Sequence, residues 1–327
     1  MPNNDTLILL NKHDVDALLT EDDALSAVHE AFSLHSRREG RSFPVIREPL
    51  PGGSIFGIKA GDVGSQGLLG FKAAGFWPSN RTRGGEPHQA TIVLIDPQTG
   101  RPCCIIDGNS ITTQRTGAAG SLGLQHLARP DSHRLCVFGT GVQARIQTTY
   151  ALRLLPHIDC VRYVSFDDNP DPDFEAHFAA HFAGRCQPTH ARDRDAAVAE
   201  SDIVITATPG HGALFSASAV RPGTHINCVG ADTKGKRELP PGLLARARLF
   251  VDDQAQARLI GESQWAPDTA SCELGDLLTG EAVFFRQPTD ITVFDMTGLA
   301  LQDLTTARLL LARAQERGLG TRVAWPW

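Results

Sequence analysis

The chain has 327 residues, of which 41% are hydrophobic and 21% are charged, so we expect a globular protein with room for two domains. Its formal net charge is −6, its isoelectric point is near 6.0, and no run of Lys or Arg occurs, which argues against a nucleic-acid partner. The sequence has neither a secretory signal pattern nor an apolar run of about 18 residues, so no membrane association is expected. Seven cysteines without a C-x-x-C pair favour reduced thiols in the cytoplasm over disulfides or a zinc site.

The first third of the chain is rich in strand patterns. A helix is expected over residues 21–38, where Thr20 and Asp23 form a capping box ahead of apolar residues at helical spacing. Five β-like runs follow, and a turn with Pro and Gly joins the last two as a hairpin. This pattern predicts a mostly antiparallel, strand-rich α+β domain. The runs cover residues 43–50, 54–60, 68–74, 90–96 and 102–107.

Beyond a small-residue helix from Asn109 to about Leu127, strand and helix patterns alternate from Arg134 onward. Such alternation predicts a parallel, doubly wound sheet of the Rossmann type, so the fold class is α/β with a second, strand-rich domain. The apolar helix over residues 299–317 is expected to return to the first domain. The predicted domains are therefore 1–128 together with 300–327, and 129–299.

A glycine-rich turn lies at the start of the alternating region. The apolar run from Leu135 to Phe138 predicts a buried strand, and Gly139, Gly141 and Ala144 complete a G-x-G-x-x-A pattern directly after it. In a dinucleotide site the first glycine permits the tight turn, the second lets the backbone approach a pyrophosphate, and the helix N-terminus faces the phosphates. The pattern alone also fits an ordinary turn between strand and helix.

An acidic residue at the end of the next predicted strand favours the dinucleotide interpretation. Asp167 follows this strand and could accept hydrogen bonds from the ribose hydroxyls of the adenosine. A carboxylate there repels a 2′-phosphate, and the neighbouring Asn169, Asp171 and Asp173 add no arginine to neutralise one. NAD is therefore predicted in preference to NADP, against the alternative of a solvated acidic turn.

Cationic residues in apolar or glycine-rich surroundings are the candidate substrate ligands of the first domain. Lys72, Arg47 and Arg115 lie in such segments and could bind a carboxylate, and a buried Lys72 could also transfer a proton. Lys59 is a further candidate. The alternative for each lysine is an ordinary solvated side chain on a strand.

Asp232 is the candidate proton-handling carboxylate of the second domain. It follows a predicted parallel strand and so lies at the carboxyl edge of the sheet, where ligands bind in doubly wound folds. His177 and His181, one helical turn apart, are interpreted as part of a surface helix, and no metal is predicted. No nucleophile elbow or Ser–His–Asp arrangement supports hydrolase chemistry.

These segments together resemble the ornithine cyclodeaminase/μ-crystallin family over nearly the whole chain. The resemblance implies a homodimer built through the strand-rich domain, a Rossmann domain that binds NAD(H) or NADP(H), and a small amino or imino acid substrate. The segments that carry it are 70–75, 96–101, 113–119, 137–144, 230–232 and 298–303.

Carried over position by position, the resemblance assigns roles to individual residues. Lys72 and Asp232 match catalytic positions. Arg47, Lys72 and Arg115 match ligands of the substrate carboxylate, and Lys59, Arg81, Arg83 or His88 could bind a second carboxylate; His88 could equally be a structural strand-end histidine. The predicted cofactor residues are Arg115, Thr116, Gly139, Thr140, Gly141, Val142, Gln143, Asp167, Thr206, Ala207, Thr208, Val229, Gly230 and Leu301.

Within this family, segments 43–48, 75–80, 87–90 and 232–239 are most similar to the members that reduce iminosuccinate to L-aspartate. This similarity predicts an NADH-dependent imine reductase. The alternatives are an ornithine cyclodeaminase that retains its NAD, a cyclic ketimine (Δ1-pyrroline-2-carboxylate) reductase, and a non-catalytic, crystallin-like ligand binder.

Overall fold

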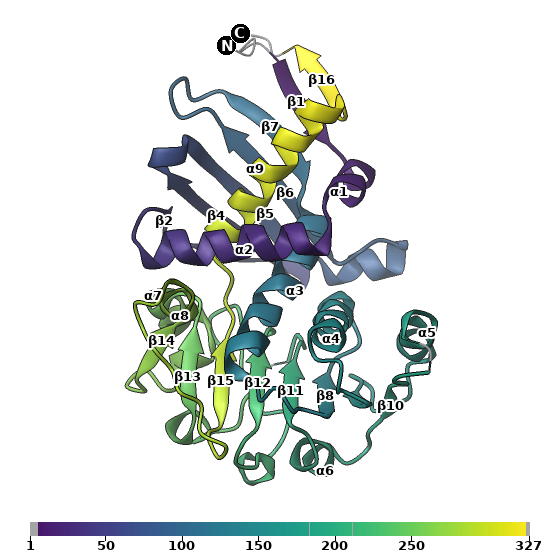
Figure 1. Cartoon of the computed structure of the whole chain (residues 1–327). Helices are drawn as coiled ribbons and strands as arrows, with labels where there is room; N and C mark the ends of the chain where they lie inside the picture. The colour runs from purple at the N-terminus through teal and green to yellow at the C-terminus, as the bar shows by residue number, and fades with distance from the viewer. Residues whose placement is uncertain (1–5, 183, 211, 325–327) are drawn as a thin grey trace. The chain divides into compact units, whose positions relative to one another are not determined.

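The computed structural model describes residues 6–182, 184–210 and 212–324 (Figure 1). The chain forms two compact units, Met1–Arg115 with Leu299–Trp327, and Thr116–Gly298. The division falls inside one helix, α3 (Gly108–Leu127), earlier than the expected boundary at residue 128. The reason is packing within the second unit, because a Cβ atom at Gly117 would lie 2.7 Å from the ring of Tyr150.

The first unit is built on an eight-stranded, mostly antiparallel sheet, counted over the described residues. The predicted hairpin of residues 90–96 and 102–107 is present as the antiparallel pair β6 (His88–Ile95) and β7 (Pro102–Asp107), and the additional strand β1 (Thr6–Leu10) pairs in parallel with β7. The sheet order is β16 (Thr321–Ala324), β1 (Thr6–Leu10), β7 (Pro102–Asp107), β6 (His88–Ile95), β5 (Leu68–Phe76), β4 (Ser54–Val63) and β2 (Arg41–Ser42), and β3 (Ile46–Leu50) also pairs with β4.

Helices cover one face of this sheet. Figure 1 shows α2 (Glu21–Ser36) and the final helix α9 (Ala300–Arg317) running across it. The predicted capping box of Thr20 and Asp23 begins α2. Gly70 of β5 allows α9 to approach closely, because a Cβ atom there would lie 2.9 Å from Leu304. The short helix α1 (Lys12–Leu18) precedes α2.

The second unit contains the predicted doubly wound sheet. The glycine-rich turn lies between strand β8 and helix α4, and the strand order changes direction between β8 and β11. The order over the described residues is β10 (Thr189–His190), β9 (Cys160–Val164), β8 (Arg134–Phe138), β11 (Ile203–Thr206), β12 (His225–Cys228), β15 (Thr292–Asp295), β13 (Arg248–Val251) and β14 (Ser271–Glu273), all parallel. The helices are α4 (Val142–Leu154), α5 (Pro172–His181), α6 (Arg194–Ala199), α7 (Gln254–Ile260) and α8 (Leu274–Thr279).

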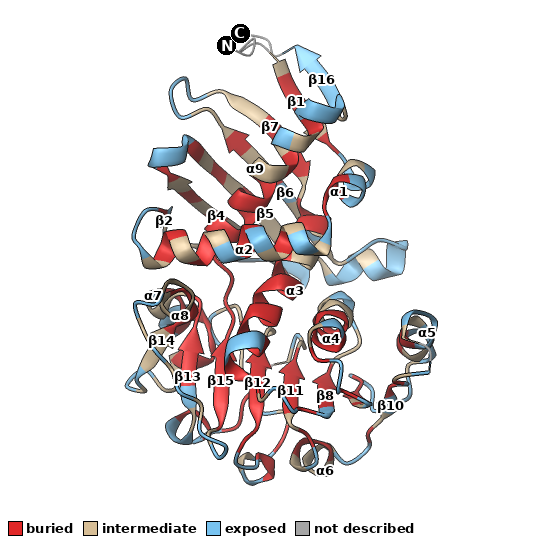
Figure 2. Ribbon diagram, in the orientation of Figure 1, coloured by how far each residue is buried: buried red, intermediate tan, exposed pale blue. Residues whose placement is uncertain are grey.

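Both faces of the parallel sheet are buried (Figure 2). Alternate residues of β8 belong to two different apolar clusters, Cys136 and Phe138 to one and Leu135 and Val137 to the other. This explains why the predicted strand is a continuous apolar run rather than an alternating one. Within the described ranges, no helix is both long enough and apolar enough to cross a membrane.

Candidate active site

A cluster of buried charges forms in the first unit where β5, α3 and α9 meet. The ammonium of Lys72 lies 2.8 Å from the carboxylate of Asp303 and donates to the hydroxyl of Thr112 at 3.2 Å. The guanidinium of Arg115 donates to Asp303 at 3.1 Å and to the side chain of Gln302 at 3.1 Å. One carboxylate therefore holds two of the cations that the sequence predicted as substrate ligands.

Two more predicted cations belong to the same face of the sheet. Lys59 of β4 is buried and lies directly opposite Lys72 in the β4–β5 register, so both side chains point to the same side. Arg47 of β3 lies over Gly57, where a Cβ atom would be 2.8 Å from its Cδ. Gly57 and Lys59 are two residues apart and share a face, so Arg47 reaches the side that carries the lysines. Strand register thus gathers residues scattered in sequence.

The electrostatics of this cluster favour proton transfer at Lys72. Burial, reinforced by the positive charge of Arg115, lowers the pKa of Lys72 to about 7, although Asp303 opposes the shift. Burial alone would raise the pKa of Asp303, but the charges of Lys72 and Arg115 outweigh it and lower that pKa. Lys72 can therefore exchange a proton near neutral pH while Asp303 remains ionised.

His88, the other predicted ligand of the first unit, begins β6. One of its ring nitrogens lies 3.2 Å from the side-chain oxygen of Asn109, at the start of α3. This contact fits the structural alternative that the sequence left open, and a role in substrate binding stays a prediction. Arg81 lies in a short 3-10 segment with its guanidinium 5.8 Å from the ring centre of Phe76.

In the second unit, the glycine-rich turn has the geometry that a pyrophosphate site requires. Gly139 has a φ of +103°, which a residue with a side chain rarely adopts, and Gly141 has open space where a Cβ would be. No side chain caps the N-terminus of α4, and Val142 there is exposed. Backbone N–H groups and the helix dipole are thus available for an anion. The buried side-chain oxygen of Gln143 has no hydrogen-bond partner among the described residues.

The end of β9 places two acidic residues next to the turn. Asp167 is exposed, and hydrogen bonds from Asn169 lower the pKa of its carboxyl group. Asp168, with a φ of +55°, pairs with Arg194 at 2.7 Å. The residues next to Asp167 in the sequence include no arginine, but Arg194, the first residue of α6, lies close by in the fold. The carboxylate of Asp168 pairs with this arginine, and the role of Asp167 at a ribose stays a prediction.

Asp232 lies in the loop after β12, at the carboxyl edge as predicted. Its carboxylate receives hydrogen bonds from Lys236 at 2.9 Å and from the hydroxyl of Thr233 at 3.1 Å. Lys236 also donates to the backbone of Gly230 at 3.4 Å. The loop therefore holds Asp232 in a local ion pair that remains partly exposed.

The other predicted cofactor residues fall into three places. Thr206 ends β11, with Ala207 and Thr208 after it, and Val229 and Gly230 follow β12, all at the carboxyl edge of the parallel sheet. The backbone oxygen of Thr116 accepts a hydrogen bond from Gln147 at 2.7 Å. Leu301 is fully buried in the first unit, and a Cβ atom at Gly40 would lie 2.7 Å from it.

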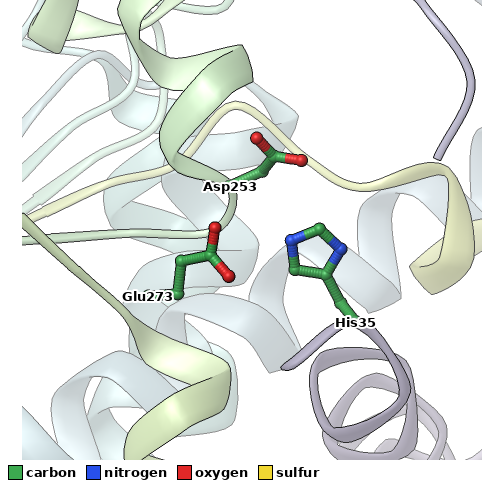
Figure 3. A group of neighbouring side chains, drawn as sticks. All are labelled: His35, Asp253 and Glu273. Carbon is green, nitrogen blue, oxygen red and sulfur yellow. The ribbon is translucent and has the colours of Figure 1, made fainter. Parts of the chain in front are cut away.

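Figure 3 draws three further polar residues. His35 is buried near the end of α2 in the first unit. In the second unit, Asp253 accepts a hydrogen bond from the backbone of Gln256 at 2.8 Å, and Glu273 accepts one from that of Gln254 at 3.1 Å. Both carboxylates therefore cap the first turn of α7. The rings of His177 and His181 lie 4.7 Å apart and tilted by 36° in α5, one helical turn from each other.

Comparison with known proteins decides the family. Residues 5–318 match the model of the ornithine cyclodeaminase/mu-crystallin family. The chain belongs to this family. It is 33% identical over 324 residues to the iminosuccinate reductase of Paracoccus denitrificans, which covers 97% of this chain and 99% of that protein.

Solved structures of ornithine cyclodeaminase/mu-crystallin relatives share the fold. An archaeal alanine dehydrogenase dimer with bound NAD has a TM-score of 0.89 at 28% identity, covering 97% of this chain and 99% of the other. The Paracoccus denitrificans iminosuccinate reductase in complex with NAD+ has a TM-score of 0.84 at 32% identity and the same coverage. The Δ1-pyrroline-2-carboxylate reductase of Thermococcus litoralis, with NADH and L-proline, has 0.89 at 26%, covering 97% and 100%. The predicted fold class is confirmed.

Sequence reasoning missed Asp303, the carboxylate that pairs with Lys72 and Arg115. Asp303 was part of a segment that carried the resemblance, but it received no role. The available signal was an acidic residue between the apolar Leu301 and Leu304, in the first turn of the helix. Its partners Lys72 and Arg115 are far away in the chain, so only the fold brings the three together.

Proposed function

We propose that the protein is an NADH-dependent imine reductase that forms an L-amino acid, with iminosuccinate to L-aspartate as the reaction. The observation that carries the proposal is a group of buried cations in the first unit, where the carboxylate of Asp303 pairs with both Lys72 and Arg115, and buried Lys59 lies opposite Lys72 in the strand register. Two cations on one carboxylate leave a net positive charge, which is costly when buried and which a carboxylate of the substrate would offset.

The substrate chemistry follows from this charge. Arg115 has a planar fork suited to a carboxylate, and Lys72 adds a point charge beside it. A substrate with two carboxylates needs further cations, which Lys59 and Arg47 supply on the same face of the sheet. A dicarboxylic imine therefore fits this cluster better than ornithine, whose distal ammonium would meet like charge.

NADH, when bound, supplies the hydride for the imine carbon. Arg115 and Lys72 hold the carboxylate next to that carbon and so fix its orientation. Lys72, with its pKa near 7, then gives a proton to the imine nitrogen, which becomes the amino group of the product. Asp232 is the second proposed proton-handling group. The preference for NAD over NADP is assigned to Asp167.

We also propose that the protein is a homodimer formed through the face of the antiparallel sheet opposite α9. Phe71, Val93 and Ile105 lie side by side on β5, β6 and β7 in the strand register and are partly exposed. A contiguous apolar row of this kind is typical of an interface. A light-scattering mass equal to a monomer at working concentration would contradict the dimer.

Substrate choice is tested with purified protein and NADH. Three substrates are offered separately: oxaloacetate plus ammonia, pyruvate plus ammonia, and Δ1-pyrroline-2-carboxylate. NADH oxidation is followed in each case by the loss of NADH absorbance. Oxidation is expected with oxaloacetate plus ammonia. Oxidation confined to the pyrroline compound would replace the aspartate reaction by cyclic ketimine reduction.

The cyclodeaminase alternative has its own readout. Ammonia release from ornithine without net change in NADH would make the protein a lyase. Tight NAD binding without turnover of any of these compounds would favour the non-catalytic binder.

A further inference from the structure

Glu238 is a buried carboxylate that the proposed chemistry does not use. It has no solvent exposure, and both of its oxygens accept hydrogen bonds. One oxygen accepts from the backbone N–H and the hydroxyl of Thr208, each at 2.7 Å. The other accepts from the hydroxyl of Thr206 at 2.7 Å and from the backbone N–H of Gly230 at 2.9 Å. Four donors thus converge on one side chain.

The positions of these donors give the contact its meaning. Thr206 ends β11, and Gly230 follows β12, so both lie at the carboxyl edge of the sheet. The strand order changes direction next to β11, which is where dinucleotides bind in doubly wound folds. The glycine-rich turn also packs here, since a Cβ atom at Gly139 would lie 2.6 Å from the backbone oxygen of Ala207.

Glu238 also closes the loop that carries Asp232. Its bond to the N–H of Gly230 joins the two ends of this loop. The backbone of Glu238 is fixed in turn by the carboxylate of Glu262, which accepts its N–H at 2.5 Å. The backbone N–H of Glu262 donates to Asp295, at the end of β15, at 2.9 Å. Three buried carboxylates therefore anchor the loop to the sheet in series.

We propose that Glu238 is a positioning residue that fixes both the backbone after β11 and β12 for the dinucleotide and the loop that presents Asp232. A glutamine could not replace it, because each carboxylate oxygen accepts one backbone N–H, and an amide –NH2 at either position would face a donor. Burial raises the pKa of Glu238, and the hydrogen bonds from Thr206 and Thr208 oppose that shift. The inference extends the proposed NAD site to a residue that need not touch the cofactor.

The test compares Glu238→Gln with Asp202→Asn. Asp202 also binds two backbone N–H groups, those of His133 and Arg134, but immediately before β11 at the opposite edge of the sheet. NADH affinity is measured by fluorescence titration, and hydrogen–deuterium exchange is measured without cofactor on peptides covering 206–210 and 229–237. Glu238→Gln should weaken NADH binding roughly 10-fold or more and accelerate exchange in both peptides. Asp202→Asn should leave both readouts near the wild type, even if its melting temperature falls.

Two outcomes would overturn the inference. The first is an NADH affinity of Glu238→Gln within about twofold of the wild type, which is less than the loss of a typical hydrogen bond causes. The second is that Asp202→Asn changes NADH affinity and exchange as much as Glu238→Gln does. If wild-type protein fails to bind NADH, the proposed function fails, while the exchange data still decide whether Glu238 holds the two segments. Should Glu238→Gln not fold, Thr206→Val removes one donor with little change in shape. It should then shift both readouts in the same direction by a smaller factor, and no shift would contradict the role of Glu238.

Discussion

The two units bury charge in opposite ways. In the first unit, the carboxylate of Asp303 pairs with buried Lys72 and Arg115, and Lys59 is buried on the same face of the sheet. Among the described residues of the second unit, the buried charged side chains are carboxylates, apart from His225, whose pKa burial lowers to about 3. No lysine or arginine is buried among those described residues. Glu238 and Asp295 accept hydrogen bonds from backbone N–H and hydroxyl donors instead.

This contrast suggests different roles: the buried cations of the first unit suit ligand binding, and the buried carboxylates of the second unit hold the structure together. Hydrogen-bond donors from the backbone can stabilise a buried carboxylate without a ligand. Where two buried cations pair with one carboxylate, as Lys72 and Arg115 do with Asp303, a net positive charge remains that suits an anionic ligand. Substitutions in each unit test this distinction.

The largest effect is expected for Lys72→Met. The change keeps the apolar stem but removes both the charge and the transferable proton, so kcat/KM should fall about 100-fold or more. NADH affinity should stay unchanged, because Lys72 belongs to the first unit. Steady-state kinetics and a fluorescence titration measure the two effects. Lys12→Met, at an exposed position of the same unit, is the control, and equal losses in both variants would remove the special role of Lys72.

Asp303→Asn should strongly destabilise the first unit. It leaves the neighbouring cations without their counter-charge, which costs about 3 kcal/mol for a buried pair. The free energy of unfolding, measured with urea, should fall accordingly, and a dicarboxylate anion should restore part of it. If the variant is as stable as the wild type, Lys72 and Arg115 do not need the counter-charge of Asp303, and the comparison between the two units fails.

In the second unit, buried carboxyl groups are expected to make the stability of the protein depend on pH. Burial raises the pKa of Glu262 to about 8 and that of Asp295 to about 7, so the folded state holds protons that the unfolded chain releases near pH 4 to 4.5. Their contribution to stability is complete below the unfolded values and is lost as pH rises toward 8. Urea unfolding at pH 5 and pH 8 measures the loss.

Glu262→Gln isolates one part of that loss. The backbone N–H groups of Glu238 and Leu239 both donate to the same oxygen of Glu262, so a glutamine can still accept both hydrogen bonds. The variant should lie within about 1 kcal/mol of the wild type at pH 7 and should lose less stability on going to pH 8. An unchanged pH dependence would show that Glu262 does not titrate in this range.

The smallest effect is expected at Asp167, an exposed carboxylate outside both groups of buried charges. Asp167→Ser should narrow the preference for NADH over NADPH roughly 10-fold, because it removes the repulsion of a 2′-phosphate. Affinities for the two cofactors give the ratio. Adding Asp168→Asn, which frees Arg194, should shift the ratio a few-fold further in the same direction. An unchanged ratio in both variants would contradict the role of Asp167.

The sequence predicted most of the fold because local patterns specify it. The capping box at Thr20 and the apolar run before Gly139 locate their elements directly. Strand β1 and the edge strand β16 escaped prediction because they are short and pair with strands that are distant in the sequence, β16 with β1 and β1 also with β7.

The site was predictable only in part. Lys72 and Arg115 lay in unusual local surroundings that drew attention to them. Asp303 and Arg194 could not be assigned, because their partners are distant in sequence and adjacent only after folding. The role of Glu238 likewise depends on three separate strand ends and loops meeting at one side chain.

The discontinuity of the first unit has a consequence for synthesis. Lys72 and Asp303 are 231 positions apart, and the whole second unit is translated between them. The nascent first unit therefore has its cations long before their counter-charge leaves the ribosome, whereas the second unit is complete by Gly298. Because domains fold as units during translation, the second unit can fold first. We expect the first to remain open until its final helix arrives, so truncation before Asp303 should expose it to proteolysis.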